Sequence, residues 1–130
     1  MTRKITIGLP IYNAEKFLRK RIENIQSQTL NDFELIISNN NSTDDTHKIC
    51  KEFLENENNI KYFLQEKNQG AMWNFQFVLE KANTPYFVWA GADDIWDKDF
   101  LQENMNFLEN EKKCVGCISE VETYGNSNNR

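Results

Sequence analysis

The sequence predicts an α/β fold: an open, doubly wound, mostly parallel sheet with helices on both faces. Strand-like and helix-like segments alternate along the whole chain, and such alternation within one domain gives parallel strands joined by right-handed crossovers. The length of 130 residues gives room for a single core. We expect one domain over residues 1–122 and a polar tail over 123–130.

The first strand and helix are predicted from short apolar patterns. Apolar residues alternate with small ones over 4–9, and this strand should end at Pro10. Asn13 can cap the helix that follows, which should run to about Gln28. The apolar stripe of this helix, at helical spacing, consists of Leu18, Ile22 and Ile25.

The middle of the chain repeats this order. A second strand is predicted over 33–37 and a third over 60–64, both rich in large apolar residues. Between them, Ser42 and Asp45 have the spacing of a capping box at the start of a helix. The apolar side of that helix carries Ile49, Cys50, Phe53 and Leu54.

The second half predicts a third helix, a fourth strand, and a final helix and strand. Thr84 and Pro85 break the third helix, and the strand YFVWA follows at 86–90 with the composition of a strand buried on both faces. A further helix is expected around 101–108 and a last strand over 114–121. The apolar stripe of the third helix is Phe75, Val78, Leu79 and Ala82.

Charge and cysteine content narrow the classes of function. The net charge is −5, with 20 acidic and 15 basic residues mixed along the chain, which argues against a nucleic-acid groove built from clustered Lys and Arg. No apolar run approaches the roughly 20 residues that cross a bilayer. Three cysteines without a secretion signal are typical of reduced thiols, so we expect a cytoplasmic protein.

Polar segments should meet at the carboxyl edge of the sheet, where open α/β folds place their ligands. They follow three different strands, at 10–13, 38–43 and 91–94. In the last segment, Asp93 and Asp94 fit Mg²⁺ or Mn²⁺, which takes one or two carboxylates and completes its shell with phosphates and water. The alternative is a solvated turn in which Asp97 caps the next helix.

The residues in the first two segments each leave two interpretations open. Tyr12 can stack on a planar base while Asn13 reads its polar edges. Alternatively, Tyr12 packs as a hydrophobic staple and Asn13 is only a helix cap. Asn39 and Asn40 belong to an asparagine run, which either forms a turn or hydrogen-bonds a nucleobase.

Features beyond these segments receive less specific interpretations. The loop with Asn68 and Gly70 is a turn or an anion site, and Asn74 points to the site or to solvent. Cys114 and Cys117 have CxxC spacing, but a strand would place them on opposite faces. Two further features are expected at the surface: His47 and the basic residues Lys16, Arg19, Lys20 and Arg21.

Three stretches of the sequence are most informative when they are taken together: ITIGLPIYNAEKFLRKRIENIQSQTLNDFELIISNNNSTDDT, NQGAMWNF and YFVWAGADDIWD. Together they resemble the nucleotide-sugar-binding half of the inverting glycosyltransferase family numbered two, which has the Rossmann-like GT-A fold. The first is similar to that family's opening, the second to its Asn-x-Gly loop and helix. The third falls where the metal-binding Asp-x-Asp motif belongs. The resemblance covers about residues 4–110.

The resemblance implies roles for individual residues. Tyr12 would lie against the base, and Asn39 stands where the family has a base-reading Asp. Asp93 matches the last, metal-contacting Asp of Asp-x-Asp, Asp94 is the acid that commonly follows, and Gly91 replaces the first Asp. The nucleotide-contacting residues expected are Pro10, Tyr12, Asn13, Asn39, Asn40, Asn68, Gly70, Asn74 and Ala92, with Asp93 and Asp94 as metal ligands.

The implied function is donor binding by a glycosyltransferase: a nucleoside diphosphate-sugar held through a divalent cation, for transfer to the hydroxyl of a glycan, a lipid-linked acceptor or another acceptor. No catalytic base can be assigned, and we expect it beyond Arg130 with the acceptor half. The alternative is a non-catalytic binding or assembly module. We expect membrane association only through regions outside this sequence, and an apolar sheet edge could support a homodimer.

Overall fold

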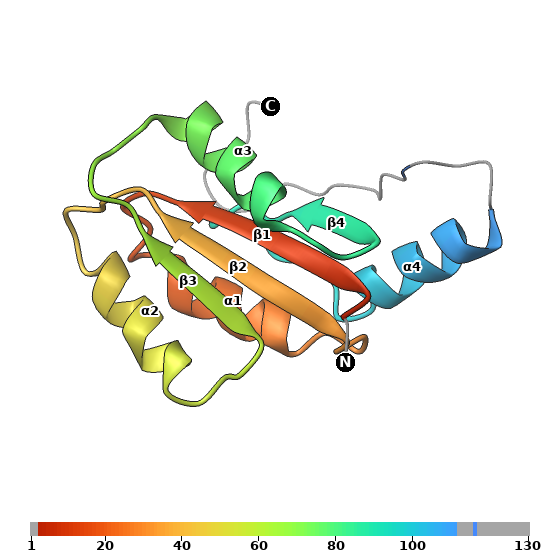
Figure 1. Ribbon diagram of the computed structural model, residues 1–130. Coiled ribbons are helices and arrows are strands. Elements are labelled where there is room, and N and C mark those ends of the chain that lie inside the picture. Colours follow the sequence, from red (N-terminus) through yellow and green to blue (C-terminus); the bar gives the residue numbers. More distant parts are fainter. Residues whose placement is uncertain (1–2, 112–115, 117–130) are drawn as a thin grey trace, which may run out of the picture.

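The computed structural model describes residues 3–111 and 116, over which strands and helices alternate as predicted (Figure 1). The last expected strand at 114–121, including Cys114 and Cys117, and the tail at 123–130 lie outside the described residues. The observed elements are β1 (Ile5–Ile11), α1 (Leu18–Gln26), β2 (Phe33–Asn39), α2 (Thr46–Leu54), β3 (Ile60–Leu64), α3 (Ala71–Lys81), β4 (Tyr86–Trp89) and α4 (Phe100–Asn110).

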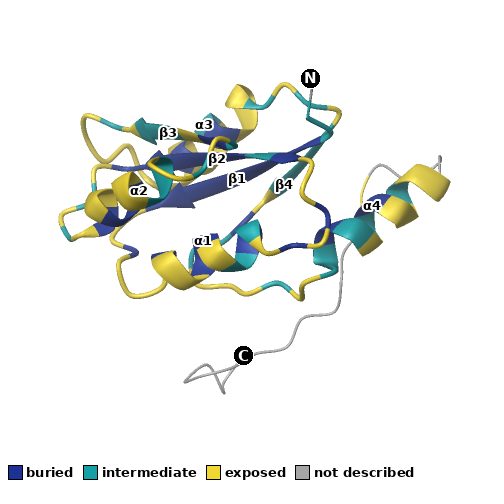
Figure 2. Ribbon diagram, turned by 90° about the horizontal axis from the view of Figure 1, so that it is seen from below, coloured by how far each residue is buried: buried dark blue, intermediate teal, exposed yellow. Residues whose placement is uncertain are grey.

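The four strands form one parallel sheet in the order β3-β2-β1-β4. The crossover from β3 to β4 passes over β2 and β1, so the chain reverses its direction of winding at β1. Helices α1 and α2 cover one face of the sheet and α3 covers the other (Figures 1 and 2). The predicted open, doubly wound sheet is confirmed, and its switch point lies between β1 and β4.

The main core lies between the sheet and helix α1. Every second side chain of β1 points toward α1, as the pleat of a strand requires. All of these residues are buried (Figure 2). They pack with the predicted stripe of α1 and with two residues of α4. The members from these three elements are Ile5, Ile7, Leu9, Ile11, Leu18, Ile22, Ile25, Leu101 and Met105.

On the opposite face, Gly8 allows α3 and β4 to pack directly against β1. A Cβ atom at Gly8 would lie 2.7 Å from the Phe87 ring and 2.8 Å from the Val78 side chain. Any larger residue would therefore force both neighbours to move. This close approach brings the start of α3 over the ends of β1 and β2.

β1 continues through Pro10 to Ile11, although the sequence predicted that the strand ends at Pro10. The Gly8 carbonyl accepts a hydrogen bond from Ala90 N on the β4 side, whereas the Ile11 carbonyl accepts one from Asn40 N on the β2 side. Pro10 therefore turns its missing N–H toward β4, whose pairing with β1 ends at Gly8. Proline fits there because no ladder bond needs that donor.

The predicted caps are wrong in detail. The first residues before α1, α2 and α4 make no side-chain cap hydrogen bonds. The carboxylate that serves the start of α2 belongs to Asp44, whose Oδ1 accepts from Thr46 N at 3.0 Å. The Asp97 carboxylate accepts from Lys98 N, so Asp97 does not cap α4 as the alternative for the acidic turn expected.

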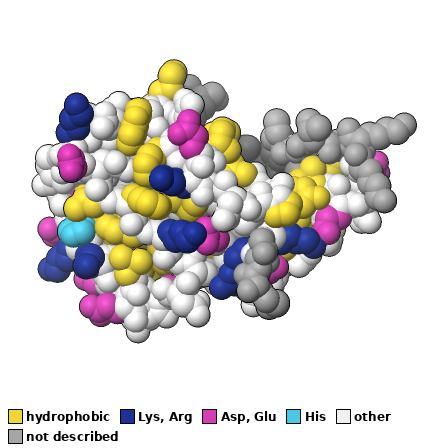
Figure 3. Space-filling view, viewed as in Figure 1, with side chains coloured by type: hydrophobic (Ala, Val, Ile, Leu, Met, Phe, Trp, Pro, Cys, Tyr) yellow, Lys and Arg dark blue, Asp and Glu magenta, His cyan; other side chains and the backbone are white. Residues whose placement is uncertain are grey.

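Strand β4 is less buried than its composition predicted because it lies at an edge of the described sheet. Its residues are half-buried, except for Trp89, which is exposed. The predicted stripe of α3 is likewise only partly correct: Val78 is buried, whereas Phe75 and Leu79 are exposed. Figure 3 shows the α3 side of the molecule, where hydrophobic side chains reach the surface.

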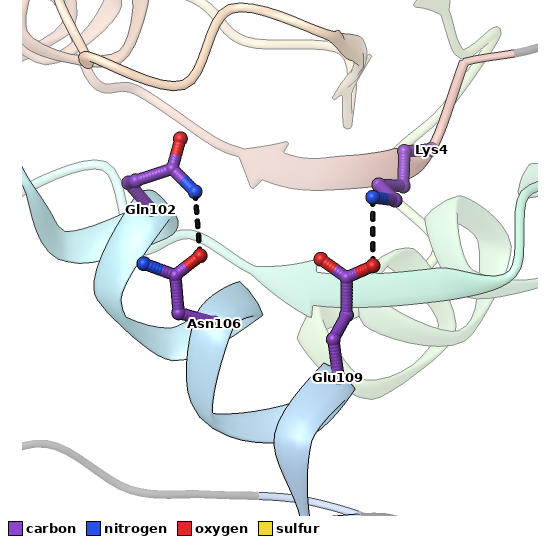
Figure 4. Close-up of polar contacts among 4 residues, drawn as sticks. All are labelled: Lys4, Gln102, Asn106 and Glu109. Carbon is purple, nitrogen blue, oxygen red and sulfur yellow. Dashed lines mark hydrogen bonds and ion pairs between the residues drawn. The ribbon is translucent and has the colours of Figure 1, made fainter.

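Helix α4 is tied to the beginning of β1. Lys4 Nζ lies 2.8 Å from Glu109 Oε2, and Gln102 donates to Asn106 one turn along the same helix (Figure 4). The bond to Glu109 raises the pKa of Lys4, although an exposed pair of this kind contributes little stability. Among the described residues, the helices are too short or too polar to span a bilayer.

Candidate nucleotide and metal site

A cavity of about 420 Å³ opens at the carboxyl edge of the sheet, a volume within the range of small-molecule sites. Residues that follow β1, β2 and β4 line it together with the start of α3, so segments far apart in sequence converge as predicted. The lining residues are Pro10, Ile11, Tyr12, Asn40, Asn68, Gly70, Ala71, Asn74, Phe75, Gly91, Ala92 and Asp93.

The corner after β1 is fixed by the turn after β2. Asn13 has φ 50°, a left-handed conformation that asparagine tolerates better than most residues. Its Oδ1 accepts from Thr43 N at 2.8 Å, and its own N–H donates to Ser42 Oγ at 2.9 Å. Asn13 therefore holds two loops together rather than capping α1, while Tyr12 beside it is 46% exposed and not packed as a staple.

Asn39 is fully buried and does not line the cavity. Its Oδ1 accepts from Ser42 N and Ser42 Oγ, and its Nδ2 donates to Tyr62 Oη at 2.9 Å. Burial raises the pKa of Tyr62 to about 12, so the phenol stays protonated and also bonds His47 Nδ1. The Asn39 amide thus shapes the turn from beneath, with His47 exposed as predicted.

Asn40 fastens the loop that leads into α3. Its Oδ1 accepts from Gln69 N at 2.9 Å and its Nδ2 donates to the Gly70 carbonyl at 3.0 Å. Within the loop, Asn68 Oδ1 accepts from Gly70 N, and Gly70 takes a φ of 92° that favours glycine. The anion and turn interpretations are therefore compatible, because this turn places the amino-terminal end of α3 at the cavity wall.

Asn74 points into the protein, not to solvent, and is 2% exposed. Its Oδ1 accepts from Ser38 Oγ at 2.5 Å, and its Nδ2 donates to the Ser38 carbonyl at 2.9 Å. A longer bond of 3.5 Å reaches the Ile11 carbonyl. This one amide joins α3 to the ends of both central strands, at the wall of the cavity.

The acidic turn contributes Asp93 to the cavity, and Asp94 lies beside it. Both residues are exposed. Asp94 Oδ2 lies 2.5 Å from the point where a Cβ on Gly91 would stand, so the Asp94 carboxylate occupies the space of the absent residue-91 side chain. Two carboxylates at one turn suit Mg²⁺ or Mn²⁺ that shares its shell with a phosphate ligand.

The described residues contain no group of three or more His, Cys, Asp and Glu side chains that could hold a metal by themselves. A cation that takes one or two protein carboxylates and several non-protein oxygens does not need such a group. Asp93 and Asp94 are the residues that would hold such a cation, which would neutralise phosphate charge at the cavity.

The sequence interpretation missed Arg21, which was expected on the solvated face of the first helix but is completely buried. Its Nε donates to the Gly91 carbonyl at 2.8 Å, and its guanidinium carbon lies 4.3 Å from the centre of the Trp96 ring. The signal was present in the spacing, because Arg21 follows Leu18 by three residues and precedes Ile25 by four, on the apolar stripe.

Eight of the eleven predicted site residues line the cavity, and three do not. Those outside are Asn13, Asn39 and Asp94, which support the turns that carry their neighbours. The eight inside are Pro10, Tyr12, Asn40, Asn68, Gly70, Asn74, Ala92 and Asp93. The prediction of convergence is therefore correct, while several amides that could have faced a ligand serve the protein's own loops.

Comparison with known proteins agrees with this architecture. Over 99 residues the chain is 35% identical to Glycosyltransferase GlyA of Streptococcus pneumoniae, a match that covers 76% of this chain and 14% of GlyA. The crystal structure of S. aureus TarS 1-349 in complex with UDP-GlcNAc superposes with a TM-score of 0.77 at 24% identity, covering 84% of this chain and 32% of that one.

A second solved structure with the same fold is the mannosyltransferase PcManGT from Pyrobaculum calidifontis in complex with GDP-Man and Mn²⁺. Its TM-score is 0.75 at 20% identity, covering 83% of this chain and 33% of that one. The present chain thus spans about a third of the two solved chains and less of GlyA. Residues 6–130 match the model of "Glycosyl transferase family 2", and the chain belongs to that family.

Proposed function

We propose that this chain binds the donor of a glycosyltransferase, a nucleoside diphosphate-sugar, together with Mg²⁺ or Mn²⁺. The whole enzyme would then transfer the sugar to an acceptor hydroxyl with inversion. The observation that carries the proposal is the cavity at the sheet edge, whose walls include both Asp93 and the amino-terminal end of α3. Family membership supports it.

The charges around the cavity favour a diphosphate bound with a cation. Asp93 is the charged side chain among the described residues that line the cavity. A phosphate about 4 Å from this carboxylate would be repelled by about 4 kcal/mol at an effective dielectric constant near 20. A divalent cation between them converts that repulsion into attraction, while the α3 end supplies a partial positive charge for the same anion.

The exposed ring of Tyr12 provides the apolar surface that a base needs. It lies at the cavity rim beside Asn40 and Asn68, whose amides are partly engaged by the loop. Base stacking on an aromatic ring tolerates different bases, so Tyr12 alone does not select one. TarS was crystallised with UDP-GlcNAc and PcManGT with GDP-Man, and both nucleotides are therefore suitable first probes.

Titration calorimetry with UDP, GDP and dTDP, each in Mn²⁺ and in EDTA, tests the proposal. At least one nucleotide should bind more tightly in Mn²⁺. Asp93→Asn should lose that metal-dependent gain. The matched control is Asp97→Asn, an exposed acid of the same segment that lies outside the cavity. The proposal is wrong if no nucleotide binds in Mn²⁺ or if the two variants behave alike.

A second candidate function is nucleotide-sugar binding without transfer. It is favoured by Gly91, which replaces the first Asp of the Asp-x-Asp motif that this segment resembles. We assign the acceptor pocket and the general base to residues outside this sequence, because the chain spans only about a third of the two solved structures. Donor binding without UDP or GDP release in the full-length protein would favour this second function.

A further inference from the structure

The charged side chain of Arg21 is buried beneath the acidic turn. Arg21 has no exposed surface, and burying a charged group is costly unless hydrogen bonds and other charges compensate for it. In most amphipathic helices, a position between Leu18 and Ile25 on the same stripe would carry an apolar residue. An arginine held there against that cost must make contacts that an apolar residue cannot make.

Two of these contacts go directly to the segment that carries the acids. Arg21 Nε donates to the Gly91 carbonyl at 2.8 Å, at the residue where β4 gives way to the acidic turn. The guanidinium also lies over the Trp96 ring, with 4.3 Å between Cζ and the ring centre. Arg21 therefore contacts both ends of the segment 91–96, with Asp93 and Asp94 between them.

Asn24, one turn further along α1, completes the arrangement. Its Oδ1 accepts from Arg21 Nη1 at 2.8 Å and from Trp96 N at 2.9 Å, and its Nδ2 donates to the Trp96 carbonyl at 2.8 Å. The backbone at Trp96 is thus held through both its N–H and its carbonyl. Donors and acceptors on α1 fix the two ends of the turn while leaving both carboxylates exposed.

We propose that Arg21 is a positioning residue for the metal and nucleotide site. It fixes the conformation of residues 91–96 from beneath, so that Asp93 lies at the cavity before the ligand arrives. This proposal deepens the proposed function and rests on it for its effect on binding. The effect on the turn itself is independent of any ligand, because every contact that carries it lies within the protein.

Substitution should affect metal-dependent binding more than binding of the nucleotide alone. Arg21→Met keeps an apolar stem but removes the donor to Gly91 and the cation over Trp96. We expect the affinity for UDP in Mn²⁺ to fall by about 10- to 100-fold, the range found when residues that orient metal ligands are lost. Affinity for UDP in EDTA should change by less than about twofold, which a general loss of structure would not produce.

The matched control is Arg19→Met, on the same helix but with its guanidinium about half-exposed and paired with Glu52 at the surface. Arg21→Lys is the second variant, since it keeps the charge but places all its donors on one nitrogen, whereas Arg21 uses Nε for Gly91 and Nη1 for Asn24. Its affinity for UDP in Mn²⁺ and its rate of hydrogen exchange over 91–96 should both lie between those of wild type and Arg21→Met.

Hydrogen exchange supplies the readout that does not require a ligand. The amides of Asp94, which donates to the Gly91 carbonyl, and Trp96, which donates to Asn24 Oδ1, should exchange at least about tenfold faster in the Arg21 variants than in Arg19→Met, while amides of β1 and β2 stay protected. Unchanged exchange there, or equal UDP affinities in Mn²⁺ for the Arg21 and Arg19 variants, overturns the proposal. A wild-type protein that binds no nucleotide contradicts the proposed function, and the exchange rates then decide the role of Arg21.

Discussion

Replacing Asn74 by leucine should destabilise the protein far more than its position on a half-exposed helix indicates. Leucine keeps the approximate volume but removes the bonds of 2.5 Å to Ser38 Oγ and 2.9 Å to the Ser38 carbonyl. Two hydrogen bonds contribute about 1 kcal/mol each, and buried partners left unpaired add about 1–3 kcal/mol. We therefore expect a loss of about 3–5 kcal/mol in the free energy of unfolding.

Urea and thermal unfolding, followed by far-UV circular dichroism, measure this loss. For a domain of this size, it corresponds to a fall in Tm of roughly 10–20 °C. Gln76→Leu is the control, because it is the same kind of change on α3 but removes one exposed bond to Glu80, and it should change stability by less than about 0.5 kcal/mol. If the two variants unfold alike, the assignment of Asn74 as a buried link is wrong.

Three further predictions concern single sites. Gly8→Ala should cost about 1–3 kcal/mol in urea unfolding, because its Cβ would lie 2.7 Å from the Phe87 ring. Gly91→Ala should displace the Asp94 carboxylate, now 2.5 Å from the new Cβ, and calorimetry should show UDP binding in Mn²⁺ weakened about tenfold with little change in Tm. Burial raises the pKa of Cys50 to about 12, so the folded protein holds that proton more tightly than the unfolded chain. This stabilisation is complete below about pH 8.5 and is lost as the pH rises toward 12, so the urea midpoint should fall faster over that range than it does for Cys50→Ala.

The order of strands and helices could be predicted because each element is encoded by residues close together in the sequence. The stripe of Leu18, Ile22 and Ile25 is an example, since all three are fully buried as the spacing indicated. The convergence of the polar segments followed from the topology alone, because parallel strands joined by crossovers end at one edge. Neither prediction required knowledge of which strands are neighbours.

Predicting which residues are buried at the edge of the sheet did require knowing which strands are neighbours. Strand order placed β4 at an edge of the described sheet, so Trp89 is exposed despite its apolar context. Strand order also set α3 above β1 and β2, which selected Asn74 and Val78 as the inward side chains instead of the more apolar Phe75. A hydrophobic stripe indicates which face can be buried, whereas the neighbouring strands decide which face is.

The site residues that sequence reasoning assigned least well are those whose partners lie far away along the chain. Arg21 was grouped with neighbouring surface bases, yet its partner Gly91 is 70 positions away. Asn39 was expected to face a ligand, but Ser42 and Tyr62 occupy its amide. Both side chains can serve a ligand or a loop equally well by chemistry, so only the folded geometry separates these roles.

The use of asparagine at this edge has an electrostatic consequence. Each buried amide both donates and accepts, so Asn40 and Asn74 can join separate segments without adding charge beside the cavity. Aspartate could accept the same bonds but would lose the donor half and place further negative charge near Asp93. The neutral framework therefore leaves the field at the cavity to three features: the exposed acids, the buried Arg21 beneath them and the positive end of α3. A ligand that combines a cation with a diphosphate complements all three, whereas a diphosphate alone would leave the acids uncompensated and a cation alone would leave Arg21 and the end of α3 uncompensated.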